Sequence, residues 1–182
     1  MSKRALIVID LQNDYFEGGK WTLVGIDAAA ANAARLIGAF RQSGEMIVHV
    51  RHEFPTTEAP FFAPGSPGAE INPVVSPAEG ETVVLKHSAN AFKDTELKDL
   101  LDRNGIEDVV ICGAMSHICI DGSTRAAADL GYTCTLIHDA CASRDLQFNE
   151  VTVPAADVHA AFMSALGFGY AQVTAADAFL QK

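Results

Sequence analysis

Residues 108–119 read Asp108-Val-Val-Ile-Cys-Gly-Ala-Met-Ser-His-Ile-Cys119. The first part is a continuous apolar run with β-branched residues, which is typical of a strand buried on both faces of a parallel sheet. Gly113 follows this run, and Ser116 is a residue type that can cap the start of a helix. The stretch therefore predicts a buried strand that leads into a helix, with Cys119 in the first turn of that helix.

Further apolar runs of the same kind lie on both sides of this stretch. They are Ala5–Ile9, Met46–Val50, Thr82–Leu85, Thr133–Ile137 and a weaker Tyr170–Val173. Helical patterns lie between most of them, at 27–44, 94–105, 154–167 and 175–180, besides the helix that begins near residue 116. This alternation predicts an α/β fold with an open parallel sheet and helices on both faces. No repeat or linker is visible, so residues 1–182 are expected to form a single domain.

One segment breaks the alternation. Between His52 and Gly80 there is no periodicity, although six of the seven prolines of the chain fall there. A long irregular stretch in a compact domain is usually functional or disordered, and the aromatic residues Phe54, Phe61 and Phe62 argue against disorder. The segment is expected to be either a lid over a site or an interface for a partner.

Composition narrows the class of protein. The chain has 182 residues, of which 49% are hydrophobic and 20% charged, and its formal net charge is −10. These values favour a globular domain, and the negative charge disfavours nucleic acid as a partner. No run approaches the roughly 20 apolar residues of a membrane helix, so no membrane association is expected. The N-terminal apolar run is too short for a signal peptide, and a cytoplasmic location is expected.

Three reactive residues stand where strands are expected to end. Asp10 follows the first strand, Lys86 the third, and Cys119 the fourth. Ligands of open parallel sheets bind beyond the carboxyl ends of the strands. Taken singly, each residue has an ordinary explanation: a turn-forming aspartate, an exposed lysine and a buried helix cysteine. Their occurrence together favours a catalytic site.

Each of the three residues has an expected task. A helix N-terminus stabilises an anion, so the pKa of the Cys119 thiol is expected to be lowered and its thiolate to act as the nucleophile. Asp10 would accept the thiol proton and return it to a leaving amine, and Lys86 would support both charges. In the strand order 3-2-1-4-5-6, however, strand three is not beside strand one. Lys86 must then reach across with its long side chain.

The order of these motifs resembles a known family. Ile9-Asp10-Leu-Gln-Asn-Asp-Tyr-Phe16, then Lys86, then Gly113-Ala-Met-Ser-His-Ile-Cys-Ile-Asp-Gly-Ser-Thr124 resemble the isochorismatase-like cysteine hydrolases, over about residues 4–180. The resemblance implies a three-layer α/β/α sandwich with a six-stranded, mainly parallel, Rossmann-like sheet. It implies a catalytic triad of Asp10, Lys86 and Cys119 that forms a thioester acyl-enzyme and releases ammonia or an amine.

Further expectations follow from the same resemblance. A cis peptide bond is expected between Ala114 and Met115, with the backbone N–H groups of Met115 and Cys119 as an oxyanion hole. A homo-oligomer, dimer or tetramer, is also implied. The metal-binding nicotinamidases of the family carry an Asp-x-His pair after the second strand, where this chain has Val50-Arg-His-Glu53. Neither a metal nor another cofactor is therefore expected.

Several other side chains are candidates for the pocket, although packing or hydrogen bonding explains each of them equally well. The candidates for the substrate pocket are Gln12, Phe16, Trp21, His52, Phe61 and His117. Arg51 and Arg144 are candidates for an anionic substrate group or for surface ion pairs. His87 and Asn90 are candidates for supporting roles.

The sequence thus predicts an amidohydrolase that cleaves a C–N bond, other than a peptide bond, in a small molecule. Three alternatives stay open at this point. They are a catalytically idle or thiol-redox oligomeric protein on the same fold, an isochorismatase-type hydrolase of another small substrate, and a metal-dependent amidase.

Overall fold

A computed structural model describes residues 3–181. Its centre is a six-stranded sheet in the order β3-β2-β1-β4-β5-β8, and every neighbouring pair in it is parallel. The strands are β1 (Lys3–Ile9), β2 (Met46–His52), β3 (Thr82–Lys86), β4 (Ile106–Ala114), β5 (Thr133–Ala142) and β8 (Gln172–Thr174). The predicted fold class, a mainly parallel α/β sheet with helices on both faces, is confirmed.

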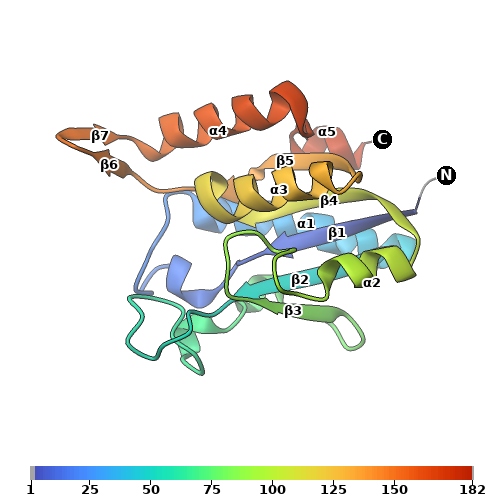
Figure 1. The fold of residues 1–182 in the computed structure, drawn as a ribbon, viewed down its shortest axis with the longest axis horizontal. Helices are drawn as coiled ribbons and strands as arrows, with labels where there is room; N and C mark the ends of the chain where they lie inside the picture. The colour runs from blue at the N-terminus through green and yellow to red at the C-terminus, as the bar shows by residue number, and fades with distance from the viewer. Residues whose placement is uncertain (1–2, 182) are drawn as a thin grey trace.

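Helices cover both faces of this sheet. They are α1 (Ile26–Ser43), α2 (Leu97–Arg103), α3 (Asp121–Asp129), α4 (Ala155–Gly169) and α5 (Ala176–Leu180). Figure 1 shows α2 and α3 in front of the sheet and α1 behind it. None of the helices between residues 3 and 181 has the length and apolar character needed to span a membrane.

The alternation of side chains along β1 explains the two hydrophobic cores. Leu6 and Val8 belong to the core under α1, whereas Ala5, Ile7 and Ile9 belong to the core under α2, α3 and α4. Both sets are almost fully buried. A central strand of a parallel sheet needs apolar residues on both faces, and this need produces the continuous apolar run in the sequence.

Helix boundaries differ from the sequence-based expectation at several places. The N-cap of α1 is Gly25, with φ 75°, and Asp27 lies in the first turn instead of capping the helix. Ser116 does not cap a helix: residues Ser116–Ile120 form a π turn, η4, whose N-cap is Met115, and α3 begins only at Asp121. The hydrogen bonds of Ser116 go elsewhere, as described below.

A short antiparallel hairpin was not predicted. It consists of β6 (Leu146–Phe148) and β7 (Val151–Val153), joined by Asn149 and Glu150. Figure 1 shows it extending away from the sheet, next to the N-terminal end of α4. Phe148 and Val151 are 75% and 61% exposed, so the hairpin has no buried face and therefore no alternating apolar pattern to read.

The proline-rich segment between β2 and β3 is ordered and packed. It contains two 3₁₀ turns, η2 (Pro67–Ala69) and η3 (Pro73–Val75). Phe62, Ala69 and Val75 are buried in the core on the α1 side. Burial of these side chains fixes the position of the segment and so allows its other aromatic residues to line a cavity.

Gly113, near the end of β4, is required by the close approach of β1. Its φ is +127°, and a Cβ atom there would lie 1.9 Å from the carbonyl oxygen of Ile9. We expect Gly113→Ala to destabilise the protein by roughly 3 kcal/mol or more, because the clash is with backbone that cannot move without breaking the sheet. Gly131→Ala is the control, since Gly131 has φ +96° but nothing within 4 Å of a Cβ. Urea unfolding measures both, and equal losses of stability would contradict the steric explanation.

Candidate active site

The three predicted catalytic side chains meet at the carboxyl end of the sheet. Lys86 Nζ lies 2.7 Å from Asp10 Oδ2 and 3.3 Å from Cys119 Sγ. Asp10 and Lys86 have no exposed side-chain surface, and Cys119 is 5% exposed. β2 lies between β1 and β3, so the extended side chain of Lys86 does reach across it, as the strand order required.

The Lys86 ammonium has four acceptors around it. Besides Asp10 and Cys119, these are the carbonyl oxygen of Ser88 at 3.1 Å and His52 Nδ1 at 3.2 Å. Burial alone lowers the pKa of Lys86, but the charge of Asp10 and the contacts with Asp10 and Cys119 outweigh this effect and leave the pKa raised above its ordinary value. Lys86 therefore stays protonated and supplies a fixed positive charge.

Asp10 is held in an unusual position. It follows β1 directly with φ 53°, in the left-handed region that few residues other than glycine and asparagine or aspartate adopt. Apart from Lys86 and the Cys119 thiol, neither of its carboxylate oxygens has a hydrogen-bond partner among residues 3–181. Burial raises the pKa of Asp10, although Lys86 opposes the shift. A carboxylate with a raised pKa and few donors is suited to accept a proton.

Cys119 rests as a neutral thiol, whereas the sequence predicted a thiolate. Burial, followed by the charge of Asp10, raises its pKa to about 12, whereas Lys86 acts in the opposite direction. The sequence-based prediction of a lowered thiol pKa is therefore wrong for the resting site. Burial and the adjacent carboxylate both oppose a thiolate, and they outweigh the effect of a helix N-terminus. The resting sulfur is therefore a thiol, beside the ion pair of Asp10 with Lys86.

The π turn η4 that carries Cys119 is anchored from two sides. The peptide bond between Ala114 and Met115, just before it, is cis. Ser116 Oγ donates a hydrogen bond to the carbonyl oxygen of Ala142 at 3.0 Å and lies 2.8 Å from His159 Nδ1. Because the hydroxyl proton is already used, Ser116 accepts from His159. No site role was predicted for His159; a histidine among the mostly apolar residues of α4 was the available signal.

A cavity of about 230 Å³ opens at Cys119. This nucleophile cavity is lined by Tyr15, His52, Phe54, Phe61, His87, Ala89, Met115, Ile118 and Cys119. Aromatic side chains from the proline-rich segment form one wall, and the rings of Phe54 and Phe61 meet edge to face at 5.1 Å. The segment thus covers the site, which is what the lid interpretation expected.

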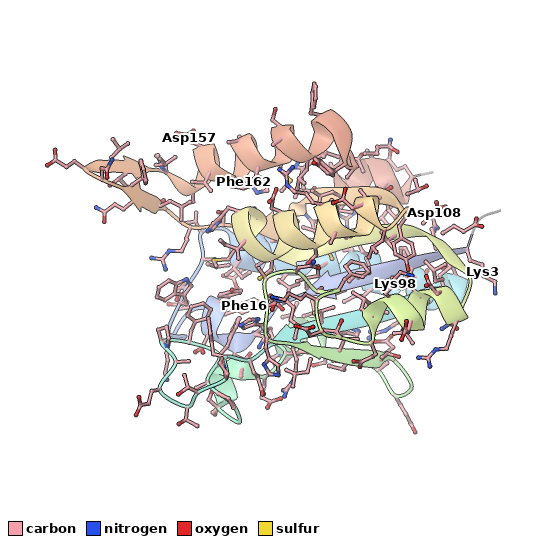
Figure 2. All side chains as sticks on the ribbon, viewed as in Figure 1. Lys3, Phe16, Lys98, Asp108, Asp157 and Phe162 are labelled. Carbon is pink, nitrogen blue, oxygen red and sulfur yellow. The ribbon has the colours of Figure 1, made fainter. Side chains whose placement is uncertain are left out.

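A second, wider cavity of about 510 Å³ adjoins the first, because Met115 and Ile118 line both. This outer cavity is also lined by Trp21, His117, Arg144, Asp145, Leu146, Gln147 and Thr152. The guanidinium of Arg144 lies 4.1 Å from the ring centre of Trp21. His117 Nδ1 forms a hydrogen bond with Ser143 Oγ at 2.8 Å. Its ring lies 6.1 Å from that of Phe162 on α4 (Figure 2).

The predicted pocket residues therefore fall into three groups. His52 and Phe61 line the nucleophile cavity, and Trp21 and His117 line the outer one. Gln12 and Phe16 line neither. Phe16 faces a separate surface depression beside Pro67 and is labelled in Figure 2. The 3₁₀ turn η1 (Asn13–Tyr15) brings Tyr15 into the cavity instead, which the sequence could not show.

Gln12 is a structural residue rather than a pocket residue. It is fully buried, and its amide donates to the carbonyl oxygens of His52 at 2.8 Å and Ala69 at 2.7 Å. Its Oε1 accepts from the backbone N–H of His52 at 2.7 Å. Both N–H groups of this buried amide are therefore used by backbone, and none is left to donate to a substrate.

The remaining polar candidates have local partners. Arg51 forms ion pairs with Glu53 at 2.6 Å and Glu70 at 3.6 Å. Asn90 accepts from the backbone N–H of Phe92, and His87 Nδ1 contacts the carbonyl oxygen of Glu53 at 2.7 Å. By contrast, Arg144 has no ion-pair partner within the described part of the chain, although it stacks on Trp21. In residues 3–181 no three histidine, cysteine, aspartate or glutamate side chains gather in a way that could hold a metal ion.

Comparison with known proteins agrees with this geometry. The chain matches the family model of the Isochorismatase domain over residues 4–177. It is 46% identical over 177 residues to the isochorismatase family protein YddQ of Bacillus subtilis, covering 97% of this chain and 98% of that one. It is 30% identical over 156 residues to maleamate amidohydrolase of Pseudomonas putida, covering 78% and 73%.

A solved structure shows the same similarity in three dimensions. It comes from Oleispira antarctica and carries the name isochorismatase hydrolase; the TM-score is 0.96 at 58% identity, covering 100% of this chain and 97% of that one. The match of the family model to nearly the whole sequence establishes the relationship. The chain belongs to the isochorismatase family of hydrolases.

Proposed function

We propose that this hydrolase cleaves the C–N bond of a small amide, with Cys119 as nucleophile, Asp10 as general base and acid, and Lys86 as electrostatic support. The observation that carries the proposal is the contact of one buried ammonium with both a carboxylate and a sulfur, at 2.7 and 3.3 Å. The similarity to an amidohydrolase supports the amide as the substrate class.

The reaction would proceed in two halves. In the first, the thiol proton passes to Asp10 as the sulfur attacks the amide carbon, and the proton then passes to the amine as the C–N bond breaks. A thioester on Cys119 and free ammonia or amine result. In the second half, Asp10 accepts a proton from water and the resulting hydroxide attacks the thioester. The C–S bond then breaks, Asp10 returns the proton to the sulfur, and the acid leaves.

The oxyanion of each tetrahedral intermediate needs donors. We propose the backbone N–H groups of Met115 and Cys119, at the start of η4, for this task. Donors fixed in the backbone need no reorganisation when charge develops, and each such donor contributes on the order of 10²-fold or more to the rate. The aromatic wall of the nucleophile cavity would exclude water and so strengthen these interactions.

A panel of small amides, ureides and lactams tests the proposed activity, with ammonia or amine release as the readout. We expect at least one compound to be hydrolysed. Because no step of the proposal uses a metal, we expect the rate to be unchanged after treatment with a chelator. Rapid oxidation and reduction of Cys119 without hydrolysis of any compound would favour the thiol-redox alternative, and loss of hydrolysis on chelation would favour the metal-dependent one.

Arg144 narrows the proposed substrate class to amides that carry an anionic group. It is a cation without an ion-pair partner among the described residues, and it lines the cavity next to Cys119. A substrate carboxylate in the outer cavity would reach Arg144 while its amide lies in the nucleophile cavity. The charge-assisted hydrogen bonds of arginine with carboxylates make this pairing favourable.

Replacement of Arg144 tests this narrower proposal. We expect Arg144→Met to raise KM for a carboxylate-bearing amide by about 10- to 100-fold, the equivalent of one charge-assisted hydrogen bond, with a smaller effect on a neutral amide. Arg51→Met is the control, because Arg51 is already paired with Glu53 and Glu70. Steady-state kinetics with matched charged and neutral amides measures the difference, and equal effects on both substrates would refute the assignment.

A further inference from the structure

We propose that His52 is a positioning residue for Lys86, which accepts a hydrogen bond from the ammonium through Nδ1 and holds it between Asp10 and Cys119. The inference rests on the proposed function, because it assigns His52 a task in that catalytic site. His52 lies at the end of β2, the strand that separates Asp10 from Lys86 in the sheet.

Lys86 has fewer N–H groups than it has acceptors around it. An ammonium has three N–H groups, and four acceptors surround this one: Asp10 Oδ2, the Ser88 carbonyl oxygen, His52 Nδ1 and Cys119 Sγ. A neutral thiol is the weakest acceptor of the four. In the resting site Asp10, Ser88 and His52 therefore take the three protons, and they fix the direction of each N–H bond.

The contact with Lys86 determines the tautomer of His52. An ammonium nitrogen has no lone pair, so the ring nitrogen that faces it at 3.2 Å must be the acceptor. The ring proton is then on Nε2. Burial, the charge of Lys86 and the neighbouring His87 lower the pKa of His52 to about 4, which keeps the ring neutral. The Ser88 carbonyl opposes this shift, but it already accepts from Lys86.

The ring of His52 is held in place independently of Lys86. Gln12 bonds both the backbone N–H and the carbonyl oxygen of His52, at 2.7 and 2.8 Å. Phe54 packs edge to face on the ring, with the centroids 4.7 Å apart. Because both the backbone and the ring of His52 are fixed, His52 can define the position of the flexible Lys86 side chain.

This arrangement has a consequence for the reaction. When Asp10 takes the thiol proton, the negative charge moves from the carboxylate to the sulfur. The ammonium must then stabilise the thiolate without following the charge away from Asp10. With His52 and Ser88 holding two of its N–H groups, the nitrogen stays in place and only the third N–H changes its partner.

Three substitutions separate this role from the alternatives. Asparagine places its Oδ1 at the same number of bonds from Cα as Nδ1 of histidine, so His52→Asn keeps an acceptor for Lys86. His52→Gln keeps a polar atom only at the position of Nε2, and His52→Leu keeps none. The first readout needs no substrate: alkylation of Cys119 by iodoacetamide at one mildly alkaline pH, followed by peptide mass spectrometry. The second is the separation of kcat from KM on an amide that the wild type hydrolyses.

We expect H52L and H52Q to slow alkylation of Cys119 and to lower kcat, each by about tenfold or more, with little change in KM. H52N should stay within about threefold of the wild type in both measurements. Wild-type rates in H52L would overturn the inference, as would H52Q retaining the rate while H52N loses it, because Nε2 would then be the working atom. If H52L does not fold, the comparison of H52N with H52Q shows whether the acceptor at the position of Nδ1 matters.

The same experiments keep this inference separate from the proposed function. If the wild type hydrolyses an amide and the Cys119→Ala variant does not, the proposed function stands whatever the His52 variants show. If the Cys119→Ala variant retains hydrolysis, the proposed function fails. The alkylation rates would still show whether His52 controls the environment of the sulfur.

Discussion

Cys119→Ala is expected to lower kcat/KM for amide hydrolysis by about 10⁴-fold or more, the scale of loss when a catalytic nucleophile is removed. No other thiol can replace it. Among the described cysteines, only Cys119 contacts Lys86 and lines the nucleophile cavity, whereas Cys112, Cys134 and Cys141 are buried in the core around the sheet.

Cys141→Ala is the matched control for this substitution. Burial also raises the pKa of Cys141 to about 12, so it resembles Cys119 in burial and acidity, but it neither contacts Lys86 nor lines the nucleophile cavity. We expect the control to keep kcat/KM within about threefold, since it lies outside the reacting groups. Steady-state kinetics on both variants, with thermal unfolding to verify folding, gives the answer. Comparable activity in the two alanine variants would remove Cys119 from the mechanism.

Asp10→Asn is expected to change two measured quantities in opposite directions. Turnover should fall by about 10³-fold or more, because asparagine cannot accept the thiol proton or return it to the amine. Alkylation of Cys119 should become about tenfold faster or more near neutral pH. The carboxylate raises the pKa of Cys119 and Lys86 lowers it, so removing the carboxylate leaves only the lysine to favour the thiolate.

Lys86→Met is the control, because it is expected to change the alkylation rate of Cys119 in the opposite direction. It removes the group whose charge and hydrogen bond lower the pKa of the thiol, so alkylation should slow. It also leaves the buried carboxylate of Asp10 without its ion-pair partner, at a cost of about 3–5 kcal/mol in stability. Iodoacetamide kinetics with peptide mapping measures all three proteins. Slower alkylation in D10N would show that Asp10 does not hold the proton-accepting role beside the sulfur.

How far the sequence could predict this site depends on the kind of interaction involved. The strand ends that carry Asp10 and Lys86 follow from apolar periodicity, because buried strands leave a plain pattern. The pKa of Cys119 cannot be predicted in this way, because it depends on burial and on the charges of Asp10 and Lys86, which are distant in sequence. The tasks of Gln12 and Tyr15 were missed for a similar reason: a 3₁₀ turn decides which of several adjacent side chains faces the cavity.

Some sequence-based expectations stay predictions. These are the homo-oligomeric state, the cytoplasmic location, the absence of a nucleic-acid or membrane partner, and the absence of a metal or other cofactor. Light scattering during size-exclusion chromatography measures the oligomeric state, and elemental analysis of the purified protein measures bound metal.

The mass of the enzyme during turnover tests the central claim most directly. Acid quenching of the reaction, followed by intact-mass and peptide mass spectrometry, would detect a thioester. We predict a mass increase equal to the substrate minus ammonia or amine, located on Cys119, which disappears when the substrate is exhausted. An acyl group on a different residue, or an amide hydrolysed at the same rate by the Cys119→Ala variant, would contradict the account.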